Sequence, residues 1–384
     1  MRKLFYILLL IPTFNFGQTT KEFIIHSKEL KSDRKIWINT PEYYEFRKDS
    51  LHLVFLLDGN NKSLFDYTVA SKRFLEGNSA DLSDYKTPQS IIIGIEQAQD
   101  RWDDFGDSIN SLKFLSFLEN EIIPYVDSTY RTVNYKILIG HSLGGRFAIN
   151  TLLNKPDLFN ATIAASPAIS NKFTDRLLTK FETLLNSEMR IDKALYFSTT
   201  YIKGDGTEEN FREFSESLEK YLKTKQVQNF RFEFNSSNTL GHSKSPFFSI
   251  PEGLHFIYSP SLWQLEIDSL FNNHSTSFSA VKNYEQRITN KFGISISIHP
   301  FVPILADELL KSKKIKEAIE LLKTEVSKQP TDLDLFALLL VQMKKNKMTD
   351  YKFYETKLLD IFKKLKTAQK EQSEWIDWID KNSR

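Results

Sequence analysis

The sequence contains no cysteine among its 384 residues. This absence excludes disulfide bonds, thiolate nucleophiles and metal sites built on cysteine. The seven histidines are scattered, without an HExxH motif or a close pair, so a zinc site built on histidine is not indicated either. We therefore predict that the protein needs no metal and no cofactor, and that its core provides stability without crosslinks.

An excess of charge of either sign is also absent. The chain has 51 Lys and Arg residues against 49 Asp and Glu residues, and two of the basic residues, Arg2 and Lys3, lie at the N-terminus. Without residues 1–20 the two classes balance. A nucleic-acid-binding protein usually has a basic excess or a basic stripe, so we predict no nucleic-acid partner.

Long apolar runs are missing, apart from a short one near the N-terminus. A basic start at Arg2 and Lys3 precedes the apolar run at residues 4–11, and a small residue, Gly17, follows. This order is typical of a secretory signal peptide, and the run is too short to span a bilayer. A buried N-terminal strand or helix is the alternative. We expect residues 1–20 to be removed and the protein to be exported, periplasmic or secreted, with no transmembrane segment.

An alternation of buried strands and helices follows. Apolar runs predict two short strands within residues 23–41 and further strands at 51–61, 89–96, 135–140, 161–167, 193–200 and 229–234. Apolar residues at helical spacing predict helices at 111–126, from residue 144 to about Pro156, and at 210–224. This alternation predicts a mostly parallel sheet covered on both faces, in which ligands bind at the carboxyl ends of the strands.

The composition changes beyond residue 275, where glycine becomes rare and lysine and leucine become common. We predict a second, all-helical domain at 276–384 after a first domain at 21–275. A tetratricopeptide-like helix pair is indicated by the spacing of Leu305, Leu309, Ala318, Leu322 and Pro330. Residues 334–347 and 351–365 would form a second pair; a plain helical appendix is the alternative. We expect this region to dock a protein partner or to cap the fold, and not to supply chemistry.

The segment Gly140-His141-Ser142-Leu143-Gly144 matches the G-x-S-x-G pattern. A predicted buried strand runs directly into it and a predicted helix follows directly, which is the context of a nucleophile elbow. Small flanking residues are needed there because the serine sits on a tight, strained turn. The alternative is a glycine-rich turn with a capping serine. We predict that Ser142 is a nucleophile.

A serine hydroxyl needs an adjacent base, and the base needs an orienting acid. In a fold with this elbow the chain order is serine, acid, histidine. His242 lies in a glycine- and serine-rich loop just after the last predicted strand, so we predict that it is the base. His255 is predicted to be a structural helix residue. His141 is predicted to be a packing residue that points away from the serine.

The acid is expected between the strand at 193–200 and the helix at 210–224. Asp205, Glu208 and Glu209 all lie there. Asp205 is preferred because its flanking glycines would let the loop turn back toward the sheet. Glu208 is the second choice, since Glu208 and Glu209 would also suit the first turn of the helix, near the positive end of its dipole.

The oxyanion formed during acyl transfer needs two preorganised donors. The first is predicted to be the backbone N–H of Leu143, directly after the nucleophile. The second is expected in the loop after the first buried strand, at Gly59 or Asn60. Asp58, in the same loop, is predicted to be a turn former.

The segments LVFLLDGNN, IIIGIE, ILIGHSLGG, SPAIS and GHSKSP together resemble the putative esterase family. This family contains esterase D and the enterochelin-esterase-like hydrolases, and the likeness covers residues 20–260. The resemblance implies an α/β-hydrolase fold and a serine carboxylic-ester hydrolase with Ser142 as nucleophile and His242 as base. It does not settle the acid.

Family members often carry an arginine and acidic residues in the loop after the IIIGIE strand. Arg101, Asp103 and Asp104 occupy that loop here, and we interpret it as part of the substrate mouth. The alternative is a solvated charged loop.

The expected function is therefore hydrolysis of a small-molecule ester through an acyl-enzyme intermediate. A siderophore-type ester and an acylated small molecule both fit this class. An acyltransferase on the same fold, and a non-catalytic binding module that uses the helical tail, are the alternatives.

Overall fold

The computed structural model describes residues 19–76, 87–106, 109–187, 192–225, 229–259 and 302–384, with isolated residues between 279 and 298. Most of the predicted signal peptide and the predicted domain boundary at 275/276 lie outside the described residues. Thr19 and Thr20, assigned above to the signal peptide, are the first residues of strand β1. No helix in the described part combines the length and the apolar character needed to cross a membrane.

An eight-stranded sheet, in the order β1-β2-β4-β3-β5-β6-β7-β8, forms the centre of the first region. Its strands are β1 (Thr19–Ser27), β2 (Ser32–Thr40), β3 (Leu51–Leu56), β4 (Ser90–Ile95), β5 (Thr132–His141), β6 (Ala161–Ala165), β7 (Lys193–Thr200) and β8 (Phe230–Ser237). The β1–β2 and β2–β4 pairs are antiparallel, and all other pairs are parallel. The carboxyl ends of β3 to β8 therefore meet at one edge. The predicted α/β-hydrolase class, with its mostly parallel sheet, is confirmed.

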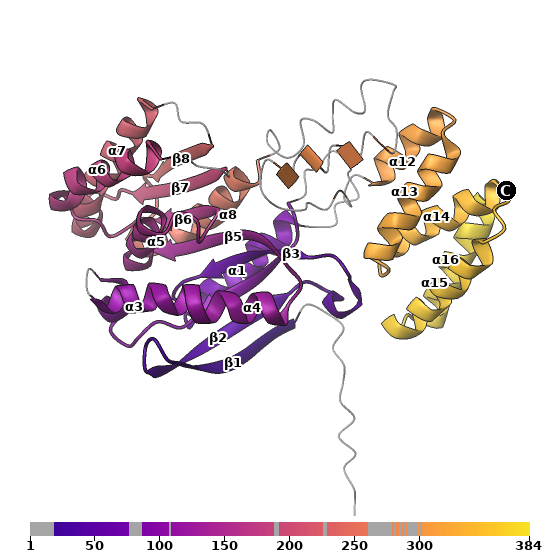
Figure 1. Ribbon diagram of the computed structural model, residues 1–384, viewed down its shortest axis with the longest axis horizontal. Helices are drawn as coiled ribbons and strands as arrows, with labels where there is room; N and C mark the ends of the chain where they lie inside the picture. Colours follow the sequence, from indigo (N-terminus) through magenta and orange to yellow (C-terminus); the bar gives the residue numbers. More distant parts are fainter. Residues whose placement is uncertain are drawn as a thin grey trace, which may run out of the picture.

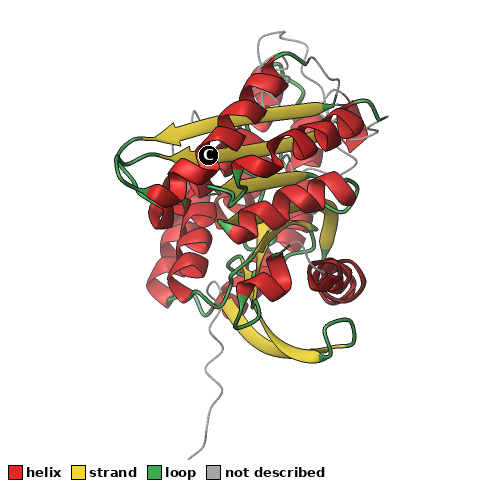
Figure 2. Cartoon of the chain, turned by 90° about the vertical axis from the view of Figure 1, so that its left-hand side faces the viewer, coloured by secondary structure: helices red, strands yellow, loops and turns green. Residues whose placement is uncertain are grey.

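Helices cover both faces of this sheet (Figures 1 and 2). They are α1 (Lys62–Leu75), α2 (Arg101–Phe105), α3 (Ile109–Phe117), α4 (Ile123–Thr129), α5 (Leu143–Asn154), α6 (Thr174–Leu185), α7 (Gly206–Lys223) and α8 (Pro246–Ile257). Along β3, Val54 packs in the core that holds α1 and α8, and its neighbour Phe55 packs in the core that holds α3 to α5. This alternation explains the near-continuous apolar run, because both faces of the strand are buried.

The helix predicted at 111–126 is interrupted. A π-helical turn (Leu118–Ile122) separates α3 from α4. Pro124 lies at the start of α4 and has no backbone N–H to donate to the preceding turn. The apolar periodicity continues through this break, so the pattern alone predicted one helix.

The C-terminal region is helical, as predicted. Its helices are α12 (Val302–Lys311), α13 (Ile315–Lys328), α14 (Leu333–Lys345), α15 (Tyr351–Leu365) and α16 (Gln369–Asn382). The side chains at the repeat positions Leu305, Leu309, Ala318 and Leu322 are fully buried. Their assignment to tetratricopeptide repeats stays a prediction.

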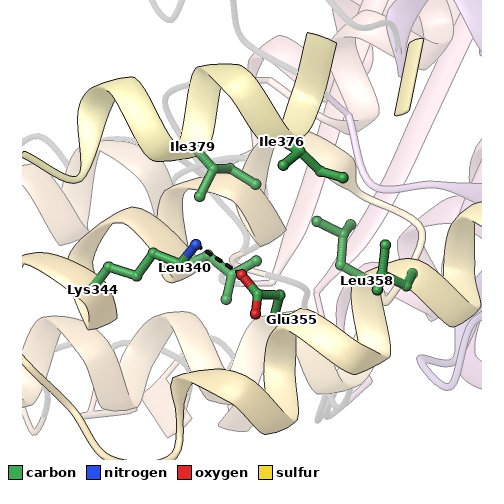
Figure 3. A pocket seen from close by; sticks show the side chains of 7 residues that line it. Leu340, Lys344, Glu355, Leu358, Ile376 and Ile379 are labelled. Atoms are coloured by element: carbon green, nitrogen blue, oxygen red, sulfur yellow. Dashed lines mark ion pairs between the residues drawn. The ribbon is translucent and has the colours of Figure 1, made fainter. Parts of the chain in front are cut away.

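These helices lie beside one end of the sheet and contact the loop between β2 and β3 (Figure 1). The Lys48 N–H donates to the Lys328 carbonyl at 3.0 Å, and the amide of Gln329 donates to Asp49 at 3.4 Å. Farther along, α14, α15 and α16 line an open, mainly apolar pocket of about 140 Å³, with the Lys344–Glu355 ion pair at its side (Figure 3). All residues that line this pocket belong to the C-terminal helices, so it is separate from the carboxyl edge of the sheet.

Candidate active site

Ser142 occupies a strained turn between β5 and α5. Its backbone angles are φ 58° and ψ −116°, in a region that a residue with a side chain rarely adopts. The Ser142 N–H donates to the carbonyl of Ala165 at 3.0 Å. Its carbonyl accepts from the N–H groups of Arg146 at 3.0 Å and Ala168 at 2.9 Å. The end of β6 and the first turn of α5 therefore hold the serine in this conformation.

Gly140 explains why this turn requires glycine. A β-carbon at position 140 would lie 2.2 Å from the carbonyl oxygen of Gly144, in the helix that follows. Neither backbone segment can move away without losing its contacts in the sheet or the helix. The strand and the helix can therefore approach closely enough to leave Ser142 at the top of the turn.

A chain of hydrogen bonds joins Ser142, His242 and Glu208. The Ser142 hydroxyl lies 2.9 Å from Nε2 of His242, and Nδ1 of His242 lies 2.6 Å from Oε1 of Glu208. An ionised carboxylate only accepts hydrogen bonds, so Nδ1 carries the proton and Nε2 accepts from the serine hydroxyl. His242 opens a short 3-10 turn after β8, and it comes from the loop in which the sequence placed the base.

Glu208 lies in the first turn of α7 with its side chain fully buried. Burial raises the pKa of this carboxyl, but hydrogen bonds from His242 and Thr199 outweigh burial and hold the pKa below its ordinary value. The Thr199 hydroxyl donates to Oε2 at 2.8 Å, and the Thr200 N–H donates to the same oxygen at 3.3 Å. The carboxylate is therefore ionised at neutral pH and has partners on both oxygens.

Asp205, the preferred acid of the sequence analysis, does not contact the ring of His242. Its Oδ1 accepts from the Thr207 N–H at 3.2 Å and so caps the N-terminus of α7. Its Oδ2 accepts from the backbone N–H of His242 at 3.1 Å. The third candidate, Glu209, is exposed on α7. The structure brings Glu208 to the imidazole, because the first turn of the helix directs this longer side chain inward.

The two predicted oxyanion loops lie at the same edge of the sheet. Leu143 is the first residue of α5, where backbone N–H groups have no partner within the helix. The Gly59 N–H donates to the Ile95 carbonyl at 2.8 Å, so the donor expected at Gly59 is already engaged. Asn60, next in the chain, is exposed. Gly59 is tied to β4 because it passes close to that strand: a β-carbon at 59 would lie 2.4 Å from the nitrogen of Ile95.

Arg101 borders the elbow and is largely occupied by protein partners. Its Nε and Nη2 donate to the two carboxylate oxygens of Asp58, each at 2.7 Å, and Nη2 also donates to the His141 carbonyl at 3.0 Å. Asp58 is buried at φ 59°, which fits its predicted turn. Burial raises the pKa of Asp58, and the Arg101 guanidinium opposes that rise. Arg101 thus braces the backbone beside Ser142.

The acidic residues of the same loop have different surroundings. Asp104 is buried and pairs with Arg34 at 3.1 Å, which is a structural contact on the antiparallel side of the sheet. Asp103 is exposed in the short helix α2. The loop therefore combines a structural ion pair with a solvated charge.

His141 contacts the loop of the predicted base. Its Nε2 lies 3.0 Å from the backbone carbonyl of His242, and the two imidazole rings are 5.0 Å apart. Burial, together with the nearby His242, lowers the pKa of His141 to about 4. The prediction that His141 points away from the site is therefore wrong. Nothing in the local sequence reveals the partner, because it is a carbonyl about a hundred residues away.

Two further observations concern His255 and possible metal ligands. His255 lies in α8 and is exposed, in agreement with a role outside the site. Within the described residues there is no group of three or more histidine, aspartate or glutamate side chains that could hold a metal ion. The fold and the arrangement at the elbow define the class of the protein, that of the α/β hydrolases.

Comparison with known proteins gives the family. The family described as "Putative esterase" matches residues 27–293, which is more than half of the chain. The chain belongs to this family.

Individual relatives agree with this assignment. A ferri-bacillibactin esterase of Bacillus subtilis is 40% identical over 57 residues, which are 15% of this chain and 20% of the relative. A siderophore triacetylfusarinine C esterase of Aspergillus fumigatus is 40% identical over 58 residues, again 15% of this chain and 20% of the relative. The matched stretch thus spans about a fifth of each of these two proteins.

Solved structures extend the likeness in fold over most of the chain. An IroE-like serine hydrolase from Shewanella oneidensis superposes with a TM-score of 0.61 at 19% identity, covering 82% of this chain and 99% of that one. An uncharacterised protein from Capnocytophaga ochracea gives a TM-score of 0.59 at 17% identity, covering 90% of this chain and 94% of that one.

Proposed function

We propose that this protein is a serine carboxylic-ester hydrolase in which Ser142 is the nucleophile, His242 the base and Glu208 the orienting acid. The observation that carries the proposal is the continuous chain of hydrogen bonds from the Ser142 hydroxyl through both nitrogens of His242 to a buried carboxylate. A serine is a weak nucleophile unless such a base takes its proton, and the acid fixes the tautomer of the base.

The proposed reaction has two halves. Oγ of Ser142 attacks the ester carbonyl while Nε2 of His242 takes the hydroxyl proton, and Glu208 stabilises the imidazolium that forms. The developing oxyanion accepts hydrogen bonds from the Leu143 N–H and from a donor in the loop at Asn60. His242 protonates the departing alcohol. A water molecule, activated by the same histidine, then releases the acid.

We propose a small-molecule ester as substrate, with siderophore-type esters first and other acylated small molecules second. This choice is supported by two of the relatives, a ferri-bacillibactin esterase and a siderophore triacetylfusarinine C esterase. Arg101 and the loop that carries it are proposed to border the mouth of the site. The basic and apolar start of the chain supports export, and the C-terminal helices are proposed as the surface for any protein partner.

The test is covalent labelling of the purified protein with a fluorophosphonate probe. We expect labelling of the wild type and its loss in Ser142→Ala. Ser128→Ala, which removes an exposed hydroxyl on α4, is the matched control and should label like the wild type. A folded wild type without labelling would contradict the proposal.

Substrate class and reaction type need a second assay. Ferric and iron-free siderophore esters, acetylated sugars and simple aryl esters are compared by kcat/KM. Product analysis with and without an added alcohol then distinguishes hydrolysis from acyl transfer. Transfer to the alcohol in preference to water would assign the acyltransferase activity instead.

A further inference from the structure

The main chain of His242 is held at both of its polar groups by side chains. The carboxylate of Asp205 accepts from the His242 N–H at 3.1 Å, and Nε2 of His141 donates to the His242 carbonyl at 3.0 Å. A carbonyl oxygen only accepts, so Nε2 of His141 must carry its proton. The same carbonyl also accepts from the N–H of Ser245 at 3.1 Å, within the short turn that His242 opens.

Each of the two side chains is tied to another member of the proposed triad. His141 directly precedes Ser142, and its own carbonyl accepts from Arg101 at 3.0 Å. Asp205 caps α7, the helix whose first turn carries Glu208. The backbone of the base is thus connected to the turn that carries the nucleophile on one side and to the helix that carries the acid on the other.

The base needs such restraints because of where it lies. His242 opens a 3-10 turn of three residues that follows a glycine- and serine-containing loop after β8. Regular structure therefore gives it little support, whereas Ser142 and Glu208 lie at the ends of long packed elements. Its ring must nevertheless reach Ser142 at 2.9 Å and Glu208 at 2.6 Å at the same time. Misplacement of a reacting group by about 1 Å can cost about a hundredfold in rate.

We propose that Asp205 and His141 are positioning residues that hold the main chain of His242, so that its ring spans Ser142 and Glu208. This inference rests on the proposed function. The packing of Gly241 supports it: a β-carbon there would lie 3.4 Å from Oδ2 of Asp205, which shows how closely this carboxylate approaches the loop of the base. Neither residue is assigned a contact with substrate.

The capping and the positioning roles of Asp205 can be separated by substitution. Asp205→Ala removes both, and Asp205→Asn keeps an oxygen and an N-cap. Asp205→Ser is the informative variant, because serine caps helices well but lacks the second oxygen, Oδ2, that accepts from the His242 N–H. We expect Asp205→Ser to retain the thermal stability of the wild type while its kcat falls about 10- to 100-fold with KM unchanged.

The role of His141 is tested by replacing it with two side chains of similar size, one that can donate a hydrogen bond and one that cannot. His141→Gln can still donate to the His242 carbonyl, and we expect near-wild-type kcat. His141→Leu cannot donate, and we expect kcat to fall about 10- to 100-fold with KM unchanged. The proton on Nδ1 of His242 gives an independent readout, since its hydrogen bond to Glu208 shifts its NMR resonance far downfield. That resonance should broaden or disappear in Asp205→Ser and in His141→Leu, and persist in His141→Gln.

The outcomes separate the two proposals. If the wild type reacts with fluorophosphonate and both Asp205→Ser and His141→Leu keep its kcat and the downfield proton, the positioning role is overturned while the proposed function stands. If the wild type itself is folded and unreactive, the proposed function fails first. A fall in kcat that His141→Gln shares with His141→Leu would also overturn the positioning role of His141.

Discussion

The carboxyl edge of the sheet and the C-terminal helices use unusual backbone conformations in different ways. At the edge, Asp58, Ser142 and Ser166 have positive φ values of 59°, 58° and 41°, and Asp58 and Ser166 are buried. In the helical region 302–384, the residues with positive φ include Lys313 and Lys366, which are exposed at or just beyond helix ends. A left-handed residue that ends a helix is routine and can relax into solvent.

The burial of charged side chains also differs between the carboxyl edge of the sheet and the C-terminal helices. At the edge, Glu208 is a fully buried carboxylate whose pKa hydrogen bonds hold down, and Asp58 is buried against Arg101. In the helical region, ion pairs such as Lys323–Asp350 are at least partly exposed to solvent. Strain and buried charge are costly and persist only where the surroundings enforce them. At the carboxyl edge, strained backbone and buried charge occur together beside Ser142, the residue proposed as nucleophile.

The largest expected effect is on activity at that edge. Glu208→Gln keeps the shape of the side chain but replaces the charge, so the tautomer of His242 and its imidazolium are no longer stabilised. We expect kcat for ester hydrolysis to fall about a thousand- to ten-thousand-fold. Glu209→Gln, one residue along and exposed, is the matched control and should leave kcat unchanged. If both substitutions lowered kcat equally, the burial of Glu208 would not explain its effect on activity.

A core substitution in the helical region should affect stability and not chemistry. Leu339 is fully buried in α14, and Leu339→Ala would leave a cavity there. We expect the free energy of unfolding to fall by about 2–5 kcal/mol in urea titrations. The kcat of the folded protein should stay at the wild-type value. A large loss of kcat at temperatures well below unfolding would show that the helices contribute to the site.

Acidification should destabilise the sheet region through His52. Burial, together with the positive charge of Lys72, lowers the pKa of His52 to about 3 from the ordinary 6.5. Between these values the unfolded chain binds a proton that the folded protein does not. The free energy of unfolding therefore falls as the pH drops through 6.5, by about 1.4 kcal/mol per pH unit from this residue.

Urea titrations at pH 5 and pH 7 measure this dependence. In His52→Asn, the free energy of unfolding should differ less between pH 5 and pH 7 than it does in the wild type. The helical region 302–384 contains no histidine, so no histidine there contributes to the pH dependence of the free energy of unfolding between pH 5 and pH 7. An unchanged difference in the variant would contradict the assignment to His52.

The smallest expected effect is that of a surface ion pair. Lys323 and Asp350 approach to 2.5 Å, yet both side chains are partly exposed, so water and salt screen their attraction. We expect Lys323→Met to change the free energy of unfolding by less than about 1 kcal/mol. Asp350→Asn should have a similarly small effect. A much larger loss would mean that this pair resembles the buried charges of the sheet edge.

Local patterns in the sequence carried much of the prediction. The strands, the helical character of the C-terminal region and the elbow at Ser142 follow from apolar periodicity and from glycines that permit a close approach of backbones. His242 followed from chain order. The break between α3 and α4 was missed because apolar spacing continues across Pro124.

The sequence by itself determined which segments form the sheet, where the serine turn lies and which loop supplies the histidine. It could not choose between Asp205 and Glu208, because a difference of three residues at the start of a helix changes the direction of a side chain by most of a turn. Only the tertiary structure places Glu208 against Nδ1 of His242. It also places Asp205 at the backbone N–H of His242 and His141 at the backbone carbonyl of His242. These contacts join segments separated by dozens to about a hundred residues, and no local pattern of residue types records such distances.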